Sequence, residues 1–206
     1  MTKNADELKL YMAISQNTPY SDVPQLIISS LLRAENQFKN NENYKLWRNS
    51  TNFKKVAIST NFKENLKIES LDNVYIDDTK RCQIICPLFD LPNVLKFSKL
   101  WKPLETENKD NSFLNQNSNG LNVYIIDEVN DYIIPNLVGH SILKFDELFI
   151  ANQKYIDWKS SSEMLVNTHF VSRDDFKYLS HELDNIYLGH ENHTLGGEKS
   201  CIIECF

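Results

Sequence analysis

The sequence predicts an α+β fold in which a twisted mixed β-sheet is covered by an N-terminal helix and by a second helix late in the chain. Three observations favour this fold. Apolar residues recur at helical spacing over residues 22–40, short runs typical of β-strands follow, and a capped amphipathic segment begins at Ser172. Because helices and strands do not alternate regularly, the pattern differs from that of a parallel βαβ protein.

The N-terminal helix is expected over residues 22–40. Asp22 can cap it, and Pro24 suits its first turn, where a backbone N–H is not needed. The apolar residues that recur near helical period are Leu26, Ile27, Leu31, Leu32 and Ala34. One face of this helix should therefore pack against the rest of the protein.

Four strands are expected, at residues 54–60, 82–89, 121–129 and 147–152. Each is a short run rich in apolar, β-branched or aromatic side chains, which fit a half-buried pleated surface. Residues 91–101 predict a short helix between the second and third of these strands.

The 206-residue chain is 41% hydrophobic and 24% charged, which is typical of a folded protein with a sizeable core. We expect residues 1–206 to form a single domain. The polar segment 105–120 is a surface loop or a boundary between two subregions. No internal repeat is visible along the sequence.

The late helix is expected over residues 172–188. Ser172 and Asp175 form an S-x-x-D capping pattern, and Gly189 supplies a C-terminal stop. The apolar residues Phe176, Leu179, Leu183 and Ile186 recur at spacings of 3, 4 and 3, which places them on one face.

The opposite face of this expected helix carries His181, Glu182 and Asn185. Because Asn185 follows His181 by four residues, the two side chains would be neighbours on a helix. Two ligand-type residues at this spacing with a glutamate beside them form half of an H-E-x-x-H zinc site. Replacing Asn185 by histidine should then raise zinc affinity.

The segment "LSHELDNIYLGHENH" resembles the metzincin form of this motif, H-E-x-x-H-x-x-G-x-x-H. The resemblance covers about residues 120–206, and only the dozen residues from His181 are specific. It implies a zincin-like fold and a zinc-dependent metallopeptidase. His181 would be a zinc ligand, Glu182 the general base, and His190 or His193 a further ligand.

Several positions depart from the metzincin pattern. Asn185 stands where the second histidine belongs, Leu188 where the glycine belongs, and Ile202 or Ile203 where a methionine is expected. Asn185 is an altered ligand at best, because an amide oxygen binds zinc less well than imidazole. Three outcomes stay open: an active peptidase with altered ligands, a similar fold with a degraded site, or an unrelated protein.

The resemblance also implies how a peptide would bind. It would add as a strand to an edge strand, either 147–152 or the preceding segment 140–145. Zinc-bound water, deprotonated with help from Glu182, would then attack the peptide carbonyl.

The remaining histidines and the cysteines have plainer interpretations. His169 is a surface residue near the helix cap or a fourth metal ligand, and His140 is a loop residue without a chemical role. The cysteines fall in two C-x3-C pairs, "CQIIC" and "CIIEC". They are buried thiols, disulfide partners or a four-thiolate metal site. No G-x-S-x-G nucleophile elbow is present.

The net charge of −6 gives no support for a nucleic-acid partner, and no apolar run is long enough for a membrane span. The expected partner is a peptide or protein, as substrate or as binding partner. If the chain is complete we expect a cytoplasmic protein, and if a signal peptide was removed, a secreted one. The alternative function is a non-catalytic intracellular binding protein, such as an inhibitor or immunity-type protein.

Overall fold

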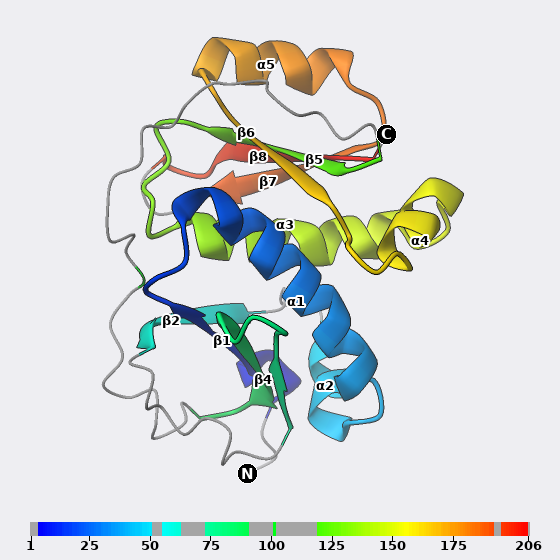
Figure 1. Ribbon diagram of the computed structural model, residues 1–206. Coiled ribbons are helices and arrows are strands. Elements are labelled where there is room, and N and C mark those ends of the chain that lie inside the picture. Colours follow the sequence, from blue (N-terminus) through cyan, green and yellow to red (C-terminus); the bar gives the residue numbers. More distant parts are fainter. Residues whose placement is uncertain are drawn as a thin grey trace. The chain divides into compact units, whose positions relative to one another are not determined.

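The computed structural model of this chain describes residues 4–50, 55–62, 73–90, 101, 119–191 and 195–205. The chain divides into two compact units. Unit 1 comprises Met1–Pro19 and Ser30–Leu104, and unit 2 comprises Tyr20–Ser29 and Glu105–Phe206. Each unit contains a four-stranded sheet and helices (Figure 1), so the predicted α+β class is confirmed.

Unit 1 contains the helices and strands of the N-terminal half. They are η1 (Ala5–Glu7), β1 (Lys9–Ser15), α2 (Glu42–Arg48), β2 (Lys55–Phe62), β3 (Val74–Ile76) and β4 (Cys82–Leu88). Helix α1 (Val23–Phe38) begins in unit 2 and ends in unit 1. The predicted strands at 54–60 and 82–89 and the N-terminal helix are therefore confirmed.

Unit 2 contains the helices and strands of the C-terminal half. They are η2 (Tyr20–Asp22), β5 (Leu121–Ile126), α3 (Ile134–Phe149), α4 (Gln153–Lys159), β6 (Val166–Val171), α5 (Arg173–Glu182), β7 (Ile186–Glu191) and β8 (Glu198–Glu204). The predicted strand at 121–129 is confirmed as β5. In the part of the chain that the structure covers, no helix combines the length and apolar character needed to cross a membrane.

The two sheets have the same topology. Their strand orders are β2-β1-β4-β3 in unit 1 and β6-β5-β8-β7 in unit 2. In each sheet the first strand of the unit pairs in parallel with the strand that follows the helices. The same first strand pairs antiparallel with the last strand, which in turn pairs antiparallel with the strand before it.

The hydrogen-bond registers align the two sheets residue by residue. Ile14 lies opposite Cys82 in unit 1, and Ile125 lies opposite Cys201 in unit 2. Counting from these pairs makes the two C-x3-C segments equivalent. Asn73 and Asn185 are equivalent as well, because Tyr75 and Tyr187 lie opposite Ile84 and Ile203.

The helices repeat with a constant offset of 111 residues, from Val23 to Ile134 (134 − 23 = 111). Identical pairs at this offset are Pro24/Pro135, Leu26/Leu137, Ser30/Ser141, Leu32/Leu143, Phe38/Phe149, Asn41/Asn152, Tyr44/Tyr155 and Trp47/Trp158. The prediction that the sequence has no internal repeat is therefore wrong. The units are two copies of one βααβ…ββ arrangement, and the different lengths of their later connections hide this in a linear comparison.

Equivalent contacts stabilise each copy internally. Asn41 and Asn152 each cap a helix by accepting from the backbone N–H three residues on, at 3.2 and 3.1 Å. The ion pair between Glu35 and Arg48 (3.3 Å) links successive helices in unit 1, and the pair between Asp146 and Lys159 (2.6 Å) does so in unit 2. Asparagine caps of this kind are worth about 1 kcal/mol each.

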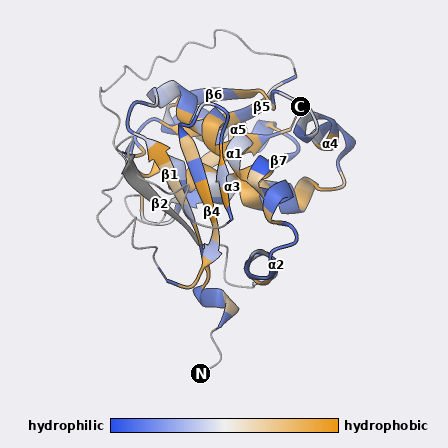
Figure 2. Cartoon of the chain, turned by 60° about the horizontal axis from the view of Figure 1, so that its bottom comes forward, coloured by the Kyte–Doolittle hydropathy of each residue, from blue (hydrophilic) through white to orange (hydrophobic). Residues whose placement is uncertain are grey.

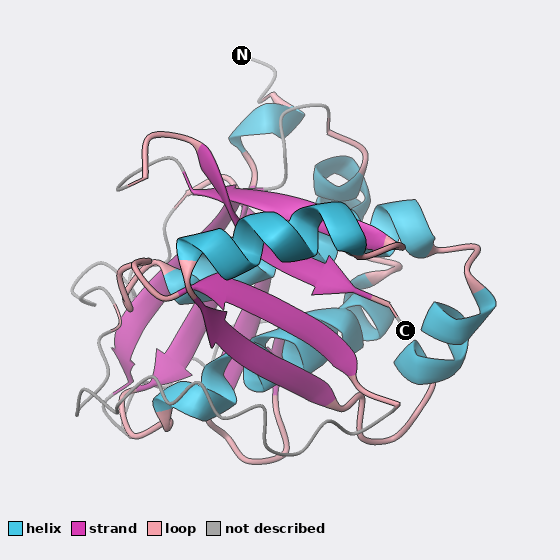
Figure 3. Ribbon diagram, turned by 90° about the horizontal axis from the view of Figure 1, so that it is seen from above, coloured by secondary structure: helices cyan, strands magenta, loops and turns pink. Residues whose placement is uncertain are grey.

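In unit 2 the sheet lies between two helices. Figure 1 shows α3 on one side of the strands and α5 on the other, and Figure 3 shows α5 crossing over the strands. Helix α3 packs against β7 and β8, and α5 packs against β5. The first turn of α5 is fixed by Arg173, which forms ion pairs with Glu128 and Glu198.

The segment Tyr20–Ser29 completes unit 2. The Tyr20 ring stacks on Phe170 of β6, with ring centroids 5.0 Å apart. The Gln25 side chain accepts from the Val166 N–H at 2.6 Å and donates to the Met164 carbonyl at 3.0 Å. These contacts attach the start of α1 to β6.

The core of unit 1 forms around β1 and β4, whose residues are nearly all buried. Figure 2 shows hydrophobic stretches along these strands. On the sheet side of α1, Ser30 lies against the Cys82 thiol, as Ser141 of α3 lies against Cys201 in unit 2. Burial raises the pKa of both thiols to about 12. Both cysteines are therefore unreactive core residues.

Two predicted strands are wrong. Residues 140–145 and most of residues 147–152 belong to helix α3 and the turn after it. Each segment contains a short apolar run, which fits a strand or a buried helix equally well, whereas over the whole of α3 the apolar residues recur at helical period. The edge strand to which a peptide was expected to add is therefore a helix.

The late helix is shorter than predicted. Ser172 caps it as expected, since its Oγ accepts from the Asp175 N–H at 3.1 Å. However, α5 ends at Glu182, Leu183 is extended, and Asn185 has a left-handed backbone with φ of 55°. Gly189 lies within β7 and is no helix stop. The loop and helix expected at 105–120 and 91–101 lie almost wholly outside the described residues.

Gly189 permits the close approach of α3 to β7. A β-carbon at this position would lie 2.0 Å from the Ser141 Oγ and 3.2 Å from its Cβ. We expect Gly189→Ala to lower the free energy of unfolding by about 1–3 kcal/mol through overpacking. Urea unfolding would measure this change.

The double variant Gly189→Ala/Ser141→Ala is the control for this prediction. Removing the Ser141 hydroxyl removes the closest contact, so the double variant should lose less stability than the sum of the single variants. Strict additivity of the two changes would contradict the role given to Gly189.

Candidate functional site

The predicted zinc ligands lie on different elements. His181 and Glu182 are exposed on the last turn of α5, and His190 is exposed on β7, where its Nδ1 lies 3.1 Å from the Gly197 carbonyl oxygen. Because the helix ends before Asn185, that residue does not lie one turn above His181. The expected helical ligand pair is therefore wrong.

No group of three or more histidine, cysteine, aspartate or glutamate side chains that could hold a metal ion occurs within the described ranges. His193 lies outside those ranges, so the predicted zinc site is not tested as a whole. All four cysteines are free and buried. The structure therefore agrees with buried thiols, and not with disulfide partners or a four-thiolate site.

Replacing Asn185 by histidine should leave zinc affinity unchanged. The reason is the turn between α5 and β7, which places residue 185 outside the helix that carries His181. Competition with a zinc-sensitive dye would measure the affinity of both proteins. A tighter site in Asn185→His would restore the original metal-site prediction.

A different group of polar side chains lies together on the sheet of unit 2. We call it the polar cluster; its members are Asn122 and Tyr124 of β5, Asn167 and His169 of β6, and Glu204 of β8. In the register of the sheet, Asn122 lies between Asn167 and Glu204, and Tyr124 lies beside His169. Because side chains alternate along a strand, all five project from one face.

This face is the one opposite α3. Cys201 faces α3 through Ser141, and its partner in the sheet is Ile125. Asn122 and Tyr124, which alternate with Ile125, therefore point to the other side, where α5 lies (Figure 1).

Hydrogen bonds connect the polar cluster. The Glu204 Oε2 accepts from the Asn122 Nδ2 at 2.9 Å and from the Tyr124 hydroxyl at 3.2 Å. The Asn167 Nδ2 in turn donates to the Asn122 Oδ1 at 2.9 Å. The carboxylate is thus held in one orientation by neutral donors, and the second asparagine fixes the first.

Aromatic stacking forms the second half of the polar cluster. The Tyr124 and His169 rings are 4.9 Å apart and nearly parallel, at 22°. Burial lowers the pKa of His169, and the charge of Glu204 opposes this shift without cancelling it. Burial and Glu204 together raise the pKa of the Tyr124 hydroxyl. Near neutral pH the imidazole and the phenol are therefore uncharged.

Unit 1 has mainly non-polar residues where unit 2 has the polar cluster. The register makes Tyr11, Ala13 and Ile85 the counterparts of Asn122, Tyr124 and Glu204. The counterparts of Asn167 and His169 are Ala57 and Ser59. Tyr11, Ala13 and Ile85 are all buried. The same sheet is therefore built without the cluster, which indicates that the fold does not require it.

Gly120 makes room for the polar cluster at the start of β5. A β-carbon there would lie 2.8 Å from the Asn167 Nδ2, which is the atom that bonds to Asn122. The counterpart of Gly120 in unit 1 is Lys9, which lies directly before Leu10 as Gly120 lies before Leu121. The backbone at this position thus accepts a residue with a side chain. In unit 2 the glycine leaves the space that the Asn167 side chain occupies.

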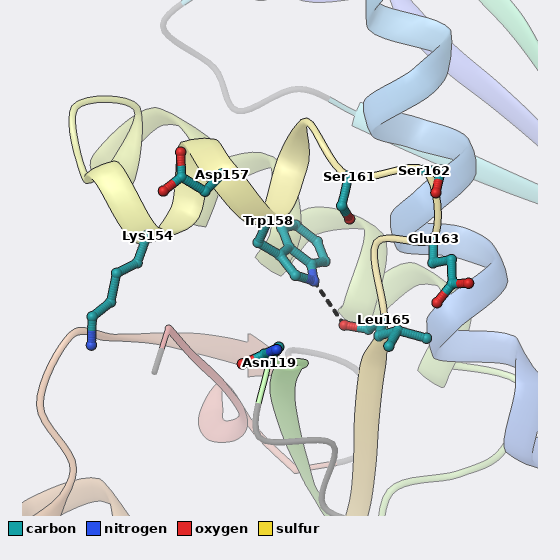
Figure 4. Close-up of a pocket in the computed structure, with 8 residues that line it drawn as sticks. All are labelled: Asn119, Lys154, Asp157, Trp158, Ser161, Ser162, Glu163 and Leu165. Atoms are coloured by element: carbon teal, nitrogen blue, oxygen red, sulfur yellow. Dashed lines mark hydrogen bonds between the residues drawn. The ribbon is translucent and has the colours of Figure 1, made fainter.

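A pocket of about 620 Å³ lies at the end of unit 2 where β5 and β6 begin. Figure 4 shows Trp158 and Leu165 together on its wall, joined by the hydrogen bond from the Trp158 Nε1 to the Leu165 carbonyl at 2.8 Å. The other lining residues are Asn119, Lys154, Asp157, Ser161, Ser162 and Glu163. Trp158 has its counterpart in the buried Trp47 of unit 1, so this wall belongs to the repeated scaffold.

The polar cluster was missed from the sequence. The sequence predicted His169 to be a surface residue or a fourth metal ligand, and it gave no role to the other members of the cluster. A usable signal existed in the two C-x3-C segments. Aligning the halves on these cysteines pairs Glu204 with Ile85. A carboxylate where the other half has an isoleucine indicates a functional position.

Searches of protein-family models, of curated proteins and of solved structures find no significant match to this chain.

Acidification should destabilise the protein in part through His169. Because burial holds its pKa below the ordinary value of 6.5, the unfolded chain takes up this proton more readily. The contribution is complete above 6.5 and is lost as the pH falls through the lower pKa of the folded state. Urea unfolding between about pH 7.5 and pH 5 should show a smaller loss for His169→Gln than for the wild type. Equal losses would contradict the assignment.

Proposed function

We propose that this protein is a binding protein and that the polar cluster on the sheet of unit 2 is its ligand site. The observation that supports the proposal is the difference between the two copies of the fold. Equivalent positions carry Tyr11, Ala13 and Ile85 in unit 1, and Asn122, Tyr124 and Glu204 in unit 2. Function, and not folding, accounts for polar residues at positions that apolar ones can fill.

The energetics favour this interpretation. Transferring an amide or hydroxyl out of water costs about 1–3 kcal/mol unless it is hydrogen-bonded, and an ionised carboxylate costs more. The internal hydrogen bonds of the polar cluster offset part of this cost for Asn122, Asn167 and Tyr124. Replacing hydrogen-bonded polar partners by apolar groups of similar shape is often neutral or stabilising, so these bonds do not by themselves explain the cluster. A ligand that uses these groups explains why they are present.

The proposal falls within the binding-protein class that was the alternative interpretation of the sequence. An inhibitor or immunity-type protein would belong to it. The zincin-like fold and the zinc-peptidase function stay predictions. No observation supports them over binding, since the helix that should carry their motif ends at Glu182.

Fragment titration by NMR tests the proposal. Probes of four kinds would be added separately to the 15N-labelled protein: acetate, ethylammonium, acetamide and glucose. At least one probe should shift the backbone amides of residues 122, 124, 167, 169 and 204 as a group. Glu204→Ile, which introduces the residue of unit 1, should remove these shifts while the rest of the spectrum is kept.

The matched control is Glu182→Gln, which removes an exposed carboxylate from the same unit. It should leave the shifts at the polar cluster unchanged. If no probe perturbs the cluster, or if Glu204→Ile responds like the wild type, the cluster is not a ligand site.

A further inference from the structure

We propose that the polar cluster binds an organic cation, an ammonium or guanidinium group, and that the Glu204 carboxylate is the group that binds it. This inference rests on the proposed function and names the chemistry of its ligand. Four features of the cluster lead to it: the orientation of the carboxylate, its lack of a countercharge, the aromatic pair beside it and the type of its polar neighbours.

The orientation of Glu204 leaves one oxygen for a ligand. Its Oε2 accepts two hydrogen bonds, from Asn122 and Tyr124, which use both lone pairs of that oxygen. Within the described part of the chain, no hydrogen bond reaches Oε1. An oxygen held in place with two open lone pairs is suited to an N–H donor, because no side-chain rotation has to be lost when the donor arrives.

The charge of Glu204 has no partner among the described residues. Glu204 is half-buried and takes part in none of the ion pairs that the structure shows there. Lys154 acts on the pKa of the neighbouring Cys205 but forms no ion pair with Glu204. Buried carboxylates are normally paired with a cation, so a cationic ligand would supply the missing partner.

The aromatic pair suits the same ligand. The Tyr124 ring is buried and stacks on the half-buried His169 beside the carboxylate. Aromatic rings next to a carboxylate favour a planar guanidinium or an ammonium group. Because burial lowers the pKa of His169, the imidazole is neutral near pH 7 and does not repel a cation.

The polar neighbours of Glu204 argue against an anion. The polar cluster contains no lysine or arginine, and its one ionised group is negative. An anionic ligand would face uncompensated repulsion, whereas the net charge of −6 on the whole chain attracts cations at long range.

Calorimetric and NMR titrations with matched ligand pairs test the inference on the full chain. N-acetyl-arginine amide is compared with N-acetyl-citrulline amide, which has nearly the same shape without the charge. N-acetyl-lysine amide is compared with N-acetyl-norleucine amide. The charged member of at least one pair should bind at least roughly tenfold more tightly, as expected for one charge-assisted hydrogen bond. Shifts should centre on residues 122, 124, 169 and 204.

Three variants locate the binding. Glu204→Gln keeps the shape of the side chain and should weaken cation binding by roughly tenfold or more. Glu182→Gln should bind as the wild type does. Gly120→Ala keeps the Glu204 charge but displaces the Asn167 that fixes Asn122, and should weaken binding through the position of the carboxylate. This last variant keeps the inference testable if Glu204→Gln does not fold.

A further comparison separates the two sources of such a cation. Tighter binding of ethylguanidinium or ethylammonium than of capped Gly-Arg-Gly or Gly-Lys-Gly indicates a free small cation, and the reverse order indicates a side chain of a peptide or protein. Either order supports the cation site.

Two results would overturn the inference. One is equal affinity for the charged and neutral members of both pairs, and the other is cation binding unaffected by Glu204→Gln. If acetate or glucose shifts the polar cluster and the cations do not, the inference fails while the proposed function stands. If no probe reaches the cluster, both fail.

Discussion

The antiparallel pairing of the first strand with the last strand determines the architecture of each unit. In unit 2 this pairing sets Asn122 opposite Glu204 and places Ile125 opposite Cys201, which faces α3. A slip of one residue would turn every side chain to the other face of the sheet. The buried Cys201 and Ile203 prevent such a slip, because the slip would move them out from under the helix. The hydrophobic side of the sheet thereby fixes the geometry of its polar side.

The duplication separates what the fold needs from what it does not. Features that both copies share, such as the asparagine caps at Asn41 and Asn152 and the tryptophans at positions 47 and 158, serve the scaffold. Features that one copy has alone are free to serve something else. Glu204 is such a feature, because Ile85 takes its place in unit 1.

The sequence predicted the local elements with strong signals and failed where signals conflict. Pro24 and the Ser172 cap located the starts of two helices correctly. Helical spacing of Phe176, Leu179, Leu183 and Ile186 then suggested one long helix, although an Asp-Asn pair at 184–185 is a turn signal. Ile186 belongs to β7, where the same apolar residue serves a strand. The repeated C-x3-C segments mark Glu204, but the rest of the polar cluster could not be predicted, because it joins three strands whose registers the sequence does not state.

The segment Tyr20–Ser29 belongs to the first copy of the motif in sequence but to unit 2 in structure. Each copy of the motif is continuous in sequence, but the packed units are not. The Tyr20 ring and the Gln25 side chain lie in the first copy and pack against β6 of unit 2. The second motif without the first would lack the Tyr20 ring that stacks on Phe170 and the Gln25 side chain that accepts from the Val166 N–H. The second motif thus depends on residues that lie within the first, so the two motifs are duplicated in sequence but are not independent in structure.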